Sequence, residues 1–290
     1  MLEEMSALQE TPAPLPDPGN FGPDSVTWRV FDDPSLVIGG LRTLLLQALH
    51  PLAMHGVAAN SDFQSDPWGR LMRTGEFLGT LTYGTRVEAD RASAAVRGIH
   101  RRLSRVLSVE PETGLSYRVQ DPDLLLWVHV TEIDSFLSTT RRCGLRLSDA
   151  QADAYVAEQV TAARLVGIDP RVTPVPSTVE EVAAYLDDVR PQLRTTSAAR
   201  RTAIFGLLPP MPPWVALATP AQPAWAALTT LAFAMLPPWA RRMYGAPGLP
   251  STDLAASLAG RALRRTLLTI PAGLREGPHR KAARQRLALA

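Results

Sequence analysis

Two stretches of this sequence are apolar on every side of a helix, and they constrain the fold more than any other feature. Residues 41–49 read LRTLLLQAL and residues 124–130 read LLLWVHV. A helix without a polar face is stable only when neighbouring elements cover it on all sides. Each stretch also follows helix-start residues, Asp32-Asp33-Pro34-Ser35 in the first case and Asp121-Pro122 in the second. We therefore expect both stretches to be buried, central helices.

The rest of the chain also carries helical signals. Ser148 and Asp149 cap an amphipathic segment that stops at Gly167. A capping box at 177–181 precedes another segment, and a further helix is expected from 195–197 to about Leu208. No strand pattern is longer than a few residues, except at 116–120. The predicted fold class is all-α, a single helical bundle domain.

Composition divides the 290 residues into three parts. Residues 1–25 are rich in proline, glycine and acid, which predicts a flexible arm. Residues 26–250 are expected to form the helical domain, and residues 251–290 a C-terminal helix and a basic tail that is exposed or frayed. Prolines within 209–250 bracket an apolar helix, with Trp214, Trp225 and Trp239 nearby. This segment is either a lid or membrane-resting surface, or a helical hairpin packed on the core.

Several classes of protein do not fit the composition. The formal net charge is +2 and the arginines are interleaved with acids, so no nucleic-acid partner is expected. The single cysteine, Cys143, rules out an intrachain disulfide and favours a reducing, cytoplasmic location. The N-terminus lacks the apolar core of a signal peptide, and no apolar run reaches the roughly 18 residues of a spanning helix. Gly-x-Ser-x-Gly, Walker A and Gly-x-Gly-x-x-Gly motifs are absent from the sequence.

A histidine lies at the edge of an apolar helical face between residues 92 and 106. On a 3.6-residue period, this face is made by Ala92, Val96, Ile99, Leu103 and Val106, and His100 falls between Val96 and Leu103. A histidine in that position faces the interior and needs a partner. The partner is either a backbone carbonyl or carboxylate, or a metal, because neutral imidazole is the commonest metal ligand.

Two arginines share the face of the helix that Asp66-Pro67 is expected to start. Arg70 and Arg73 are three residues apart, beside Leu71 and other apolar residues. Such a pair suits a bound carboxylate or phosphate, although a solvated face is the alternative.

Two further histidines interrupt the apolar helices. His50 stands before Pro51, which should kink or break the helix, so His50 either caps the freed carbonyls or lines an opening. His129 has Glu132 one turn later, which allows a hydrogen-bonded pair, a ligand or a proton-transfer group. The sequence contains neither paired Glu-x-x-His motifs for a di-iron site nor enough cysteines and histidines for a clear zinc site. One buried histidine with an apolar pocket and nearby arginines is enough to hold haem.

Three segments carry a resemblance to a known family: GGLRTLLLQALHPLAMHGVAANSDFQSDPWGRLMRT, VRGIHRRLSR and DPDLLLWVHVTEIDS. Together they resemble the family that includes the MpaB oxygenase and the rubber oxygenase (latex clearing protein), over roughly residues 30–205. The resemblance implies a globin-reminiscent helical bundle with one b-type haem and His100 as its iron ligand.

The same resemblance implies a distal side for the haem. The Arg-x-x-Lys-Thr motif of the rubber oxygenases matches Arg70, Arg73 and Thr74, with arginine in place of the lysine. That lysine can bind the iron in a closed state, whereas arginine stays protonated and is a poor ligand. An open distal position is therefore expected here, and rubber cleavage itself is in doubt.

These observations predict a haem b-dependent oxidoreductase, an oxygenase or peroxygenase that acts on an apolar small molecule or lipid-like substrate. Its electron donor or oxidant is not specified by the sequence, and peripheral contact with a membrane is a further expectation. The expected catalytic residues are Arg70, Arg73, Thr74 and His129. The expected cofactor contacts are His100 on iron, with Arg70, Arg73, His50 and Arg42. The alternatives are a haem- or lipid-binding protein without turnover, and a helical scaffold protein.

Overall fold

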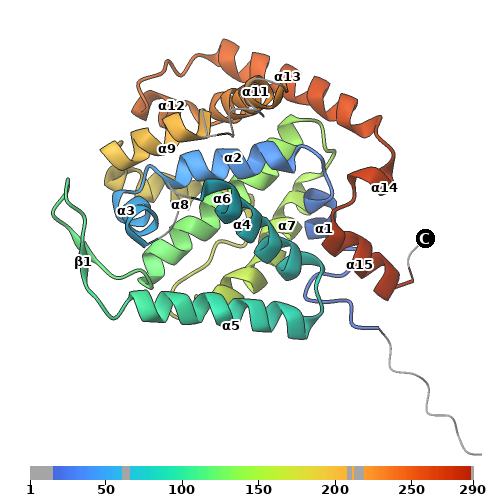
Figure 1. The fold of residues 1–290 in the computed structure, drawn as a ribbon, viewed down its shortest axis with the longest axis horizontal. Coiled ribbons are helices and arrows are strands. Elements are labelled where there is room, and N and C mark those ends of the chain that lie inside the picture. Colours follow the sequence, from blue (N-terminus) through green and yellow to red (C-terminus); the bar gives the residue numbers. More distant parts are fainter. Residues whose placement is uncertain (1–15, 61–65, 208–210, 212–218, 289–290) are drawn as a thin grey trace, which may run out of the picture.

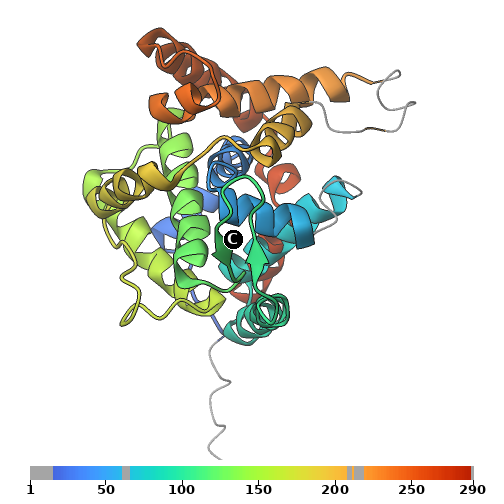
Figure 2. The ribbon, with the colours of Figure 1, turned by 90° about the vertical axis from the view of Figure 1, so that its left-hand side faces the viewer.

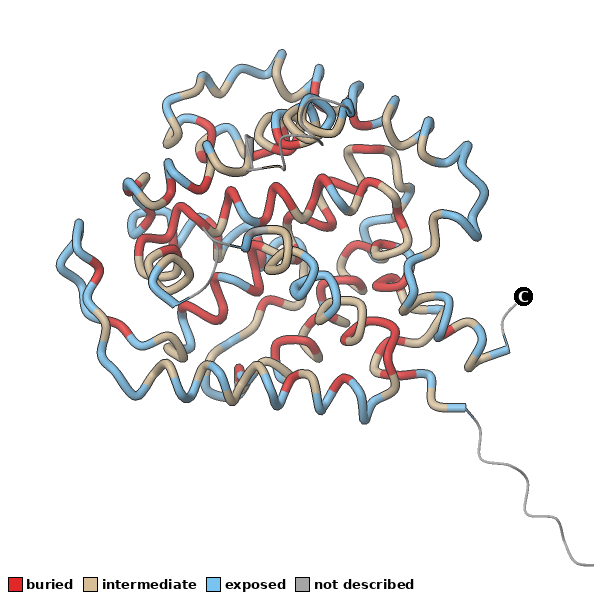
Figure 3. The backbone as a smooth tube through the Cα atoms, in the orientation of Figure 1, coloured by how far each residue is buried: buried red, intermediate tan, exposed pale blue. Residues whose placement is uncertain are grey.

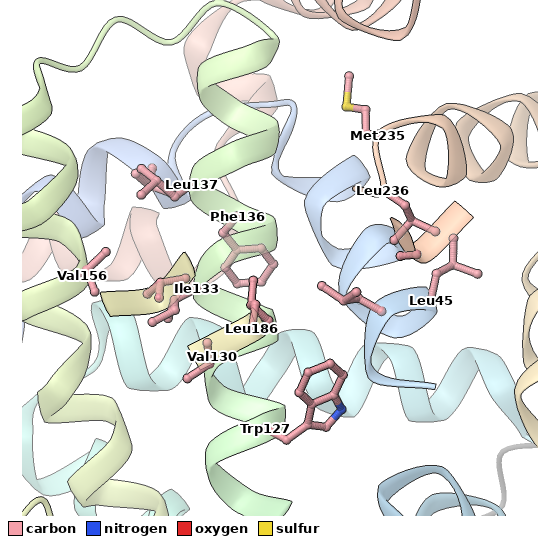
Figure 4. Packing of buried hydrophobic residues seen from close by; sticks show 14 of the residues in the cluster. Leu45, Trp127, Val130, Ile133, Phe136, Leu137, Val156, Leu186, Met235 and Leu236 are labelled. Carbon is pink, nitrogen blue, oxygen red and sulfur yellow. The ribbon is translucent and has the colours of Figure 1, made fainter. Parts of the chain in front are cut away.

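Two crossing helices form the centre of the computed structural model, which describes residues 16–60, 66–207, 211 and 219–288. They are α2 (Leu36–Gln47) and α6 (Pro122–Arg142), and both run through the interior in Figures 1 and 3. Their side chains make up much of the main apolar cluster, including Leu45, Trp127 and Ile133 (Figure 4). The two segments predicted to be central helices are therefore confirmed as such.

The helices cross closely because a glycine stands at the contact. A Cβ atom added to Gly39 of α2 would lie 3.1 Å from Cδ1 of Phe136 and 3.2 Å from the carbonyl oxygen of Ser135. Only a residue without a side chain lets the two backbones approach this far. The neighbouring Gly40 faces open space, with nothing within 4 Å of an added Cβ.

The chain turns sharply at Pro51, as its lack of a backbone donor predicts. Helix α2 ends at Gln47, α3 (Pro51–Asn60) follows, and the two axes differ by 105°. Within the described ranges, no single helix is long and apolar enough to cross a membrane, and the bent pair α2–α3 meets that test only as two pieces.

Two consecutive helices pack against each other outside this central pair. Helix α4 (Pro67–Tyr83) starts at Asp66, whose Oδ1 accepts a hydrogen bond from the amide of Gly69 at 2.8 Å. Helix α5 (Arg86–Leu103) starts with a capping box between Thr85 and Glu88. Helix α5 packs on α4 and on α7 (Asp149–Val166).

A small hairpin follows α5 and replaces the longer strand that residues 116–120 had indicated. It pairs β1 (Ser108–Val109) with β2 (Ser116–Tyr117) in antiparallel register. The described fold is otherwise helical, as predicted, and forms a single helical domain.

The C-terminal half covers the core from the other side (Figures 1 and 2). It contains α8 (Val179–Val189), the 3₁₀ turn η1 (Arg190–Gln192), α9 (Ser197–Leu207), α11 (Ala221–Ala234), α12 (Pro238–Met243) and α13 (Pro250–Leu268). Helix α11 packs on α2 between α9 and α13, and Trp225 donates from Nε1 to the carbonyl of Gly206 at 2.8 Å. These contacts favour the packed hairpin over a free lid. Trp214 lies outside the described residues.

Parts of the predicted arm and of the basic tail are ordered against the domain. Of the predicted arm, residues 1–15 lie outside the described part, but Phe21 is buried with Trp28 and Tyr83 in a second apolar cluster. The basic tail forms α14 (Ala272–Arg275) and α15 (Pro278–Arg286), and α15 packs on α4. The composition indicated disorder at both ends. At the N-terminal end, the buried ring of Phe21 anchors the chain in this cluster. At the C-terminal end, basic side chains pair with acids, as in the Arg280–Asp32 ion pair at 2.8 Å.

Candidate functional site

One face of α6, here called the open face, carries an exposed residue although the helix is central. Leu125, Val128, His129 and Glu132 share this face on a 3.6-residue period. Val128 is 37% exposed although its helix is central. Over the described residues, neither α4 nor α5 packs closely on α6. Figure 1 shows α4 crossing in front of α6 and α5 running along the lower edge of the molecule. Val128 is therefore exposed on this side of α6, next to the buried His129.

His100 comes from the last turns of α5. It is half-buried, and its Nδ1 is buried without a hydrogen-bond partner among the described residues. Burial lowers the pKa of the imidazole, so the ring stays neutral near pH 7, which is the form that binds a metal. The apolar face predicted around it is covered only in part: Ala92, Val96 and Leu103 are half-buried, whereas Ile99 is 46% exposed, and Val106, beyond the end of α5, is 68% exposed. An orphaned ring nitrogen beside uncovered apolar side chains fits a flat, apolar, metal-containing group.

His129 is the most enclosed polar group on the open face of α6. It is 7% exposed, its Nε2 has no hydrogen-bond partner among the described residues, and burial lowers its pKa to about 4. The hydrogen-bonded His129–Glu132 pair that their spacing allowed is not formed between these two described side chains. Burial instead raises the pKa of the half-buried Glu132 to about 7, and no described residue gives it a hydrogen bond or ion pair.

The three residues of the Arg-x-x-Arg-Thr motif do not converge. Arg73 has 62% of its side chain exposed, and its Nη1 is 3.1 Å from Oδ2 of Asp66 at the start of the same helix. Thr74 is exposed and donates to the carbonyl of Arg70 at 2.9 Å. Arg70 is half-buried, and burial together with the charge of Arg73 lowers its pKa. Arg70 is therefore the member of the motif with the most enclosed side chain.

His50 and Arg42 are buried at the base of the core. His50 lies with its ring centroid 5.8 Å from that of Trp127, and burial lowers its pKa to about 4. Its Nδ1 accepts a long contact, 3.5 Å, from the amide of Ala53, so it caps the start of α3 rather than the end of α2.

The guanidinium of Arg42 is committed to protein groups. It is 2.7 Å from Oδ2 of Asp134, donates to Oγ of Ser135 at 2.6 Å, and donates to the carbonyl of Met235 at 3.0 Å. A direct contact between Arg42 and a cofactor remains a prediction.

A small apolar cavity, of about 60 Å³, lies between α2, α4, α9 and α11 and opens toward solvent. Its lining includes Leu41, Leu44 and Leu45 of α2, Trp68 and Leu71 of α4, and Trp225 of α11. The rings of Trp68 and Trp225 meet edge to face, with centroids 4.8 Å apart. Leu71 follows Arg70 in sequence, so the cavity adjoins the enclosed end of the arginine motif. Sequence reasoning missed this cavity, because it depends on how four separate helices meet.

Comparison with known families decides the class of protein. A family profile described as the catalytic domain of ER-bound oxygenase mpaB/B′ and rubber oxygenase matches residues 28–269. This chain belongs to that oxygenase family. The match confirms the predicted resemblance, and it extends from α1 (Val26–Phe31) to the end of α13, beyond the segments in which the resemblance was first noticed. No curated protein and no solved structure gave a significant match.

Proposed function

We propose that this oxygenase-family protein is a haem b-dependent oxygenase or peroxygenase, with His100 as the iron ligand. The observation that carries the proposal is the buried, unpartnered Nδ1 of His100 beside a partly covered apolar face. Bound haem would supply the iron at which oxygen or peroxide is activated. The match to an oxygenase catalytic domain supports an oxidative reaction.

The residues around this site would hold the group and keep water away. Apolar side chains such as Val96 and Leu103 of α5 and Val128 of α6 would cover the ring. Arg70 would donate to a propionate or to bound oxygen, because it has the most enclosed side chain of the arginine motif. Arg73 and Thr74 would join it only if Arg73 left Asp66.

The buried imidazoles would define the rest of the pocket. The lowered pKa values of His50 and His129 keep both rings uncharged near neutral pH. Uncharged rings can line an apolar pocket at a lower desolvation cost than cations. We therefore keep His129 as a pocket residue close to the chemistry, and His50 as a support below it.

We also propose that the substrate is an apolar small molecule or a lipid-like chain. The cavity beside Leu44 and Leu71 is lined almost entirely by apolar side chains. Burial of apolar surface would supply most of the binding energy there. A cytoplasmic location and a peripheral membrane contact remain proposals, which sedimentation with anionic vesicles at low and high salt would test.

Haem binding by matched histidine variants tests the proposal. The protein produced with haem supply should show a Soret band and the pyridine haemochrome of haem b. His100→Ala should lose most of the haem while its helical circular dichroism is unchanged. His55→Ala is the control, because His55 is bonded to the hydroxyl of Tyr117 at 2.7 Å and is not assigned to iron. Full haem content with an unchanged spectrum in His100→Ala would overturn the assignment.

Product formation separates the two leading functions. The haem-loaded protein, supplied with oxygen or hydrogen peroxide and apolar test substrates, should give oxygenated products. Tight haem binding without any product would instead favour a binding protein that does not turn over.

A further inference from the structure

Exposed apolar side chains are concentrated where α5 runs into the β1–β2 hairpin, which projects at one end of the molecule (Figures 1 and 2). Five of them within 17 positions are exposed by 46% to 68%: Ile99, Val106, Leu107, Val109 and Leu115. Single exposed apolar residues are common on proteins, whereas a concentration of them marks a contact surface. We call these side chains, together with the arginines between them, the hairpin surface.

The arginines of the hairpin surface are unpaired. Arg101, Arg102 and Arg105 are exposed, and their side chains make no hydrogen bond or ion pair with any described residue. Ile99 and Arg102 are three residues apart at the end of α5, so they lie on the same side of the helix. Positive charge therefore lies beside apolar area on this surface.

The two acids of the same stretch have partners within the protein. Glu110 is 2% exposed and accepts hydrogen bonds from the amide and hydroxyl of Thr113 at 2.7 and 2.6 Å. Glu112 accepts hydrogen bonds from the amide and hydroxyl of Ser197 in α9, also at 2.7 and 2.6 Å. Neither acid forms an ion pair with the three arginines among the described residues.

The hairpin has one face toward the protein and one face away from it. Tyr117 is 2% exposed, and its hydroxyl is 2.7 Å from Nδ1 of His55 in α3. Val109 pairs with Ser116 across the two strands, and successive side chains of a strand point to opposite faces. Val109 is therefore on the face opposite Tyr117, and it points away from the protein.

We propose that the hairpin surface docks the protein on an anionic phospholipid membrane. Such a membrane presents phosphates above an apolar interior, which matches unpaired arginines beside exposed apolar side chains. Val106, Leu107 and Val109 would enter the interfacial layer, and the guanidinium groups would reach the phosphates. This inference rests on the membrane contact within the proposed function, and it adds the surface that makes this contact.

Sedimentation with vesicles tests the inference. The unmodified protein should bind vesicles that contain phosphatidylserine more strongly than vesicles of phosphatidylcholine alone, and high salt should weaken this binding. Arg102→Gln/Arg105→Gln should weaken it by roughly 30-fold, because each arginine near the membrane surface contributes about fivefold. Val106→Ser/Leu107→Ser should reduce the binding that persists at high salt, because it removes apolar contact. Both variants should keep the unmodified melting temperature, since the replaced side chains are exposed.

Leu254→Ser/Leu258→Ser on α13 is the matched control. These leucines are 64% and 56% exposed and lie one turn apart on another part of the surface, so the variant should bind vesicles like the unmodified protein. If the hairpin variants bind as the unmodified protein does, or if only the α13 variant loses binding, the inference fails while the membrane contact stands.

Two further outcomes would also overturn the inference. A dimer in analytical ultracentrifugation that both hairpin variants dissociate would assign the hairpin surface to a second copy of this chain. An unmodified protein that binds neither kind of vesicle would remove the membrane contact as well. Haem content, measured separately, tests the cofactor part of the proposed function independently of either result.

Discussion

Replacement of Arg42 by methionine should destabilise the fold by about 3 kcal/mol. Arg42 is 2% exposed and joins α2 to α6 and to the end of α11 through Asp134, Ser135 and Met235. Methionine fills much of the same space but leaves the Asp134 carboxylate and two polar groups without their donor. Breaking a buried ion pair from one side costs about 3–5 kcal/mol. We expect the lower end, because the Asp134 side chain keeps 20% exposure and can be partly hydrated.

Chemical denaturation and thermal melting measure this effect. For a domain of this size, a loss of about 3 kcal/mol should lower the melting temperature by roughly 6 °C. Arg42→Met/Asp134→Leu should recover much of the loss, since it removes both charges. Arg141→Met is the control: its ion pair with Asp149, whose side chain is 96% exposed, should contribute less than about 1 kcal/mol.

The same variant decides between the two roles considered for Arg42. If the arginine is structural, the variant melts earlier but still binds haem with the same stoichiometry and spectrum once folded. A variant that melts like the unmodified protein yet loses its haem would refute the reasoning from the ion pair. That result would restore Arg42 as a cofactor contact.

Three further predictions concern pH, packing and the arginine motif. Burial lowers the pKa of His50 from 6.5 to about 4, so the unfolded state binds more protons between these pH values and the folded state loses stability as the pH falls. His50→Phe removes this titration, so urea titrations at pH 7 and pH 4.5 should show a stability loss that is smaller by up to about 3 kcal/mol than in the unmodified protein. Gly39→Ala should lower the free energy of unfolding by about 1–2 kcal/mol, because the new Cβ meets the α6 backbone. Gly40→Ala meets nothing within 4 Å and should raise the free energy of unfolding by up to about 1 kcal/mol. Thermal melts that rank the two variants in the opposite order would contradict the close crossing. Arg73→Ala should change the free energy of unfolding by less than about 1 kcal/mol, because the Arg73–Asp66 ion pair is exposed. A large loss of oxidative activity in this variant would therefore show a direct role of Arg73 at the distal side. Unchanged activity would leave that role to Arg70.

Local chemistry explains which parts of the fold could be predicted. The apolar stretches, the proline at 51 and the Asp66-Pro67 start each act over a few residues, and the structure has the expected helices at each place. The docking of α15 and the burial of Phe21 depend on contacts between distant segments, which no local pattern specifies.

The candidate site could be predicted only in part for the same reason. Helical periodicity placed His100 at the edge of an apolar face, but it could not show that Ile99 and Val106 stay exposed, because that depends on how other elements pack on α5. Glu132 was noticed only as a neighbour of His129, and Tyr155 was missed. The lack of a hydrogen-bond partner for the Tyr155 hydroxyl becomes apparent only when α6 and α7 are side by side.

The contact between the two ends of the described chain has a consequence for how the protein can be rearranged. Arg286 of α15 donates to the carbonyl of Asp17 at 2.9 Å and to that of Tyr83 at 2.8 Å, a contact that spans 269 positions in the first case. Because these ends meet, a short linker could join them and new termini could be opened in the exposed hairpin turn at residues 111–115. Such a circular permutant would keep every helix contact. It would bring α15 next to α1 in sequence, so a shorter chain segment would have to close before the apolar cluster around Trp28 can form.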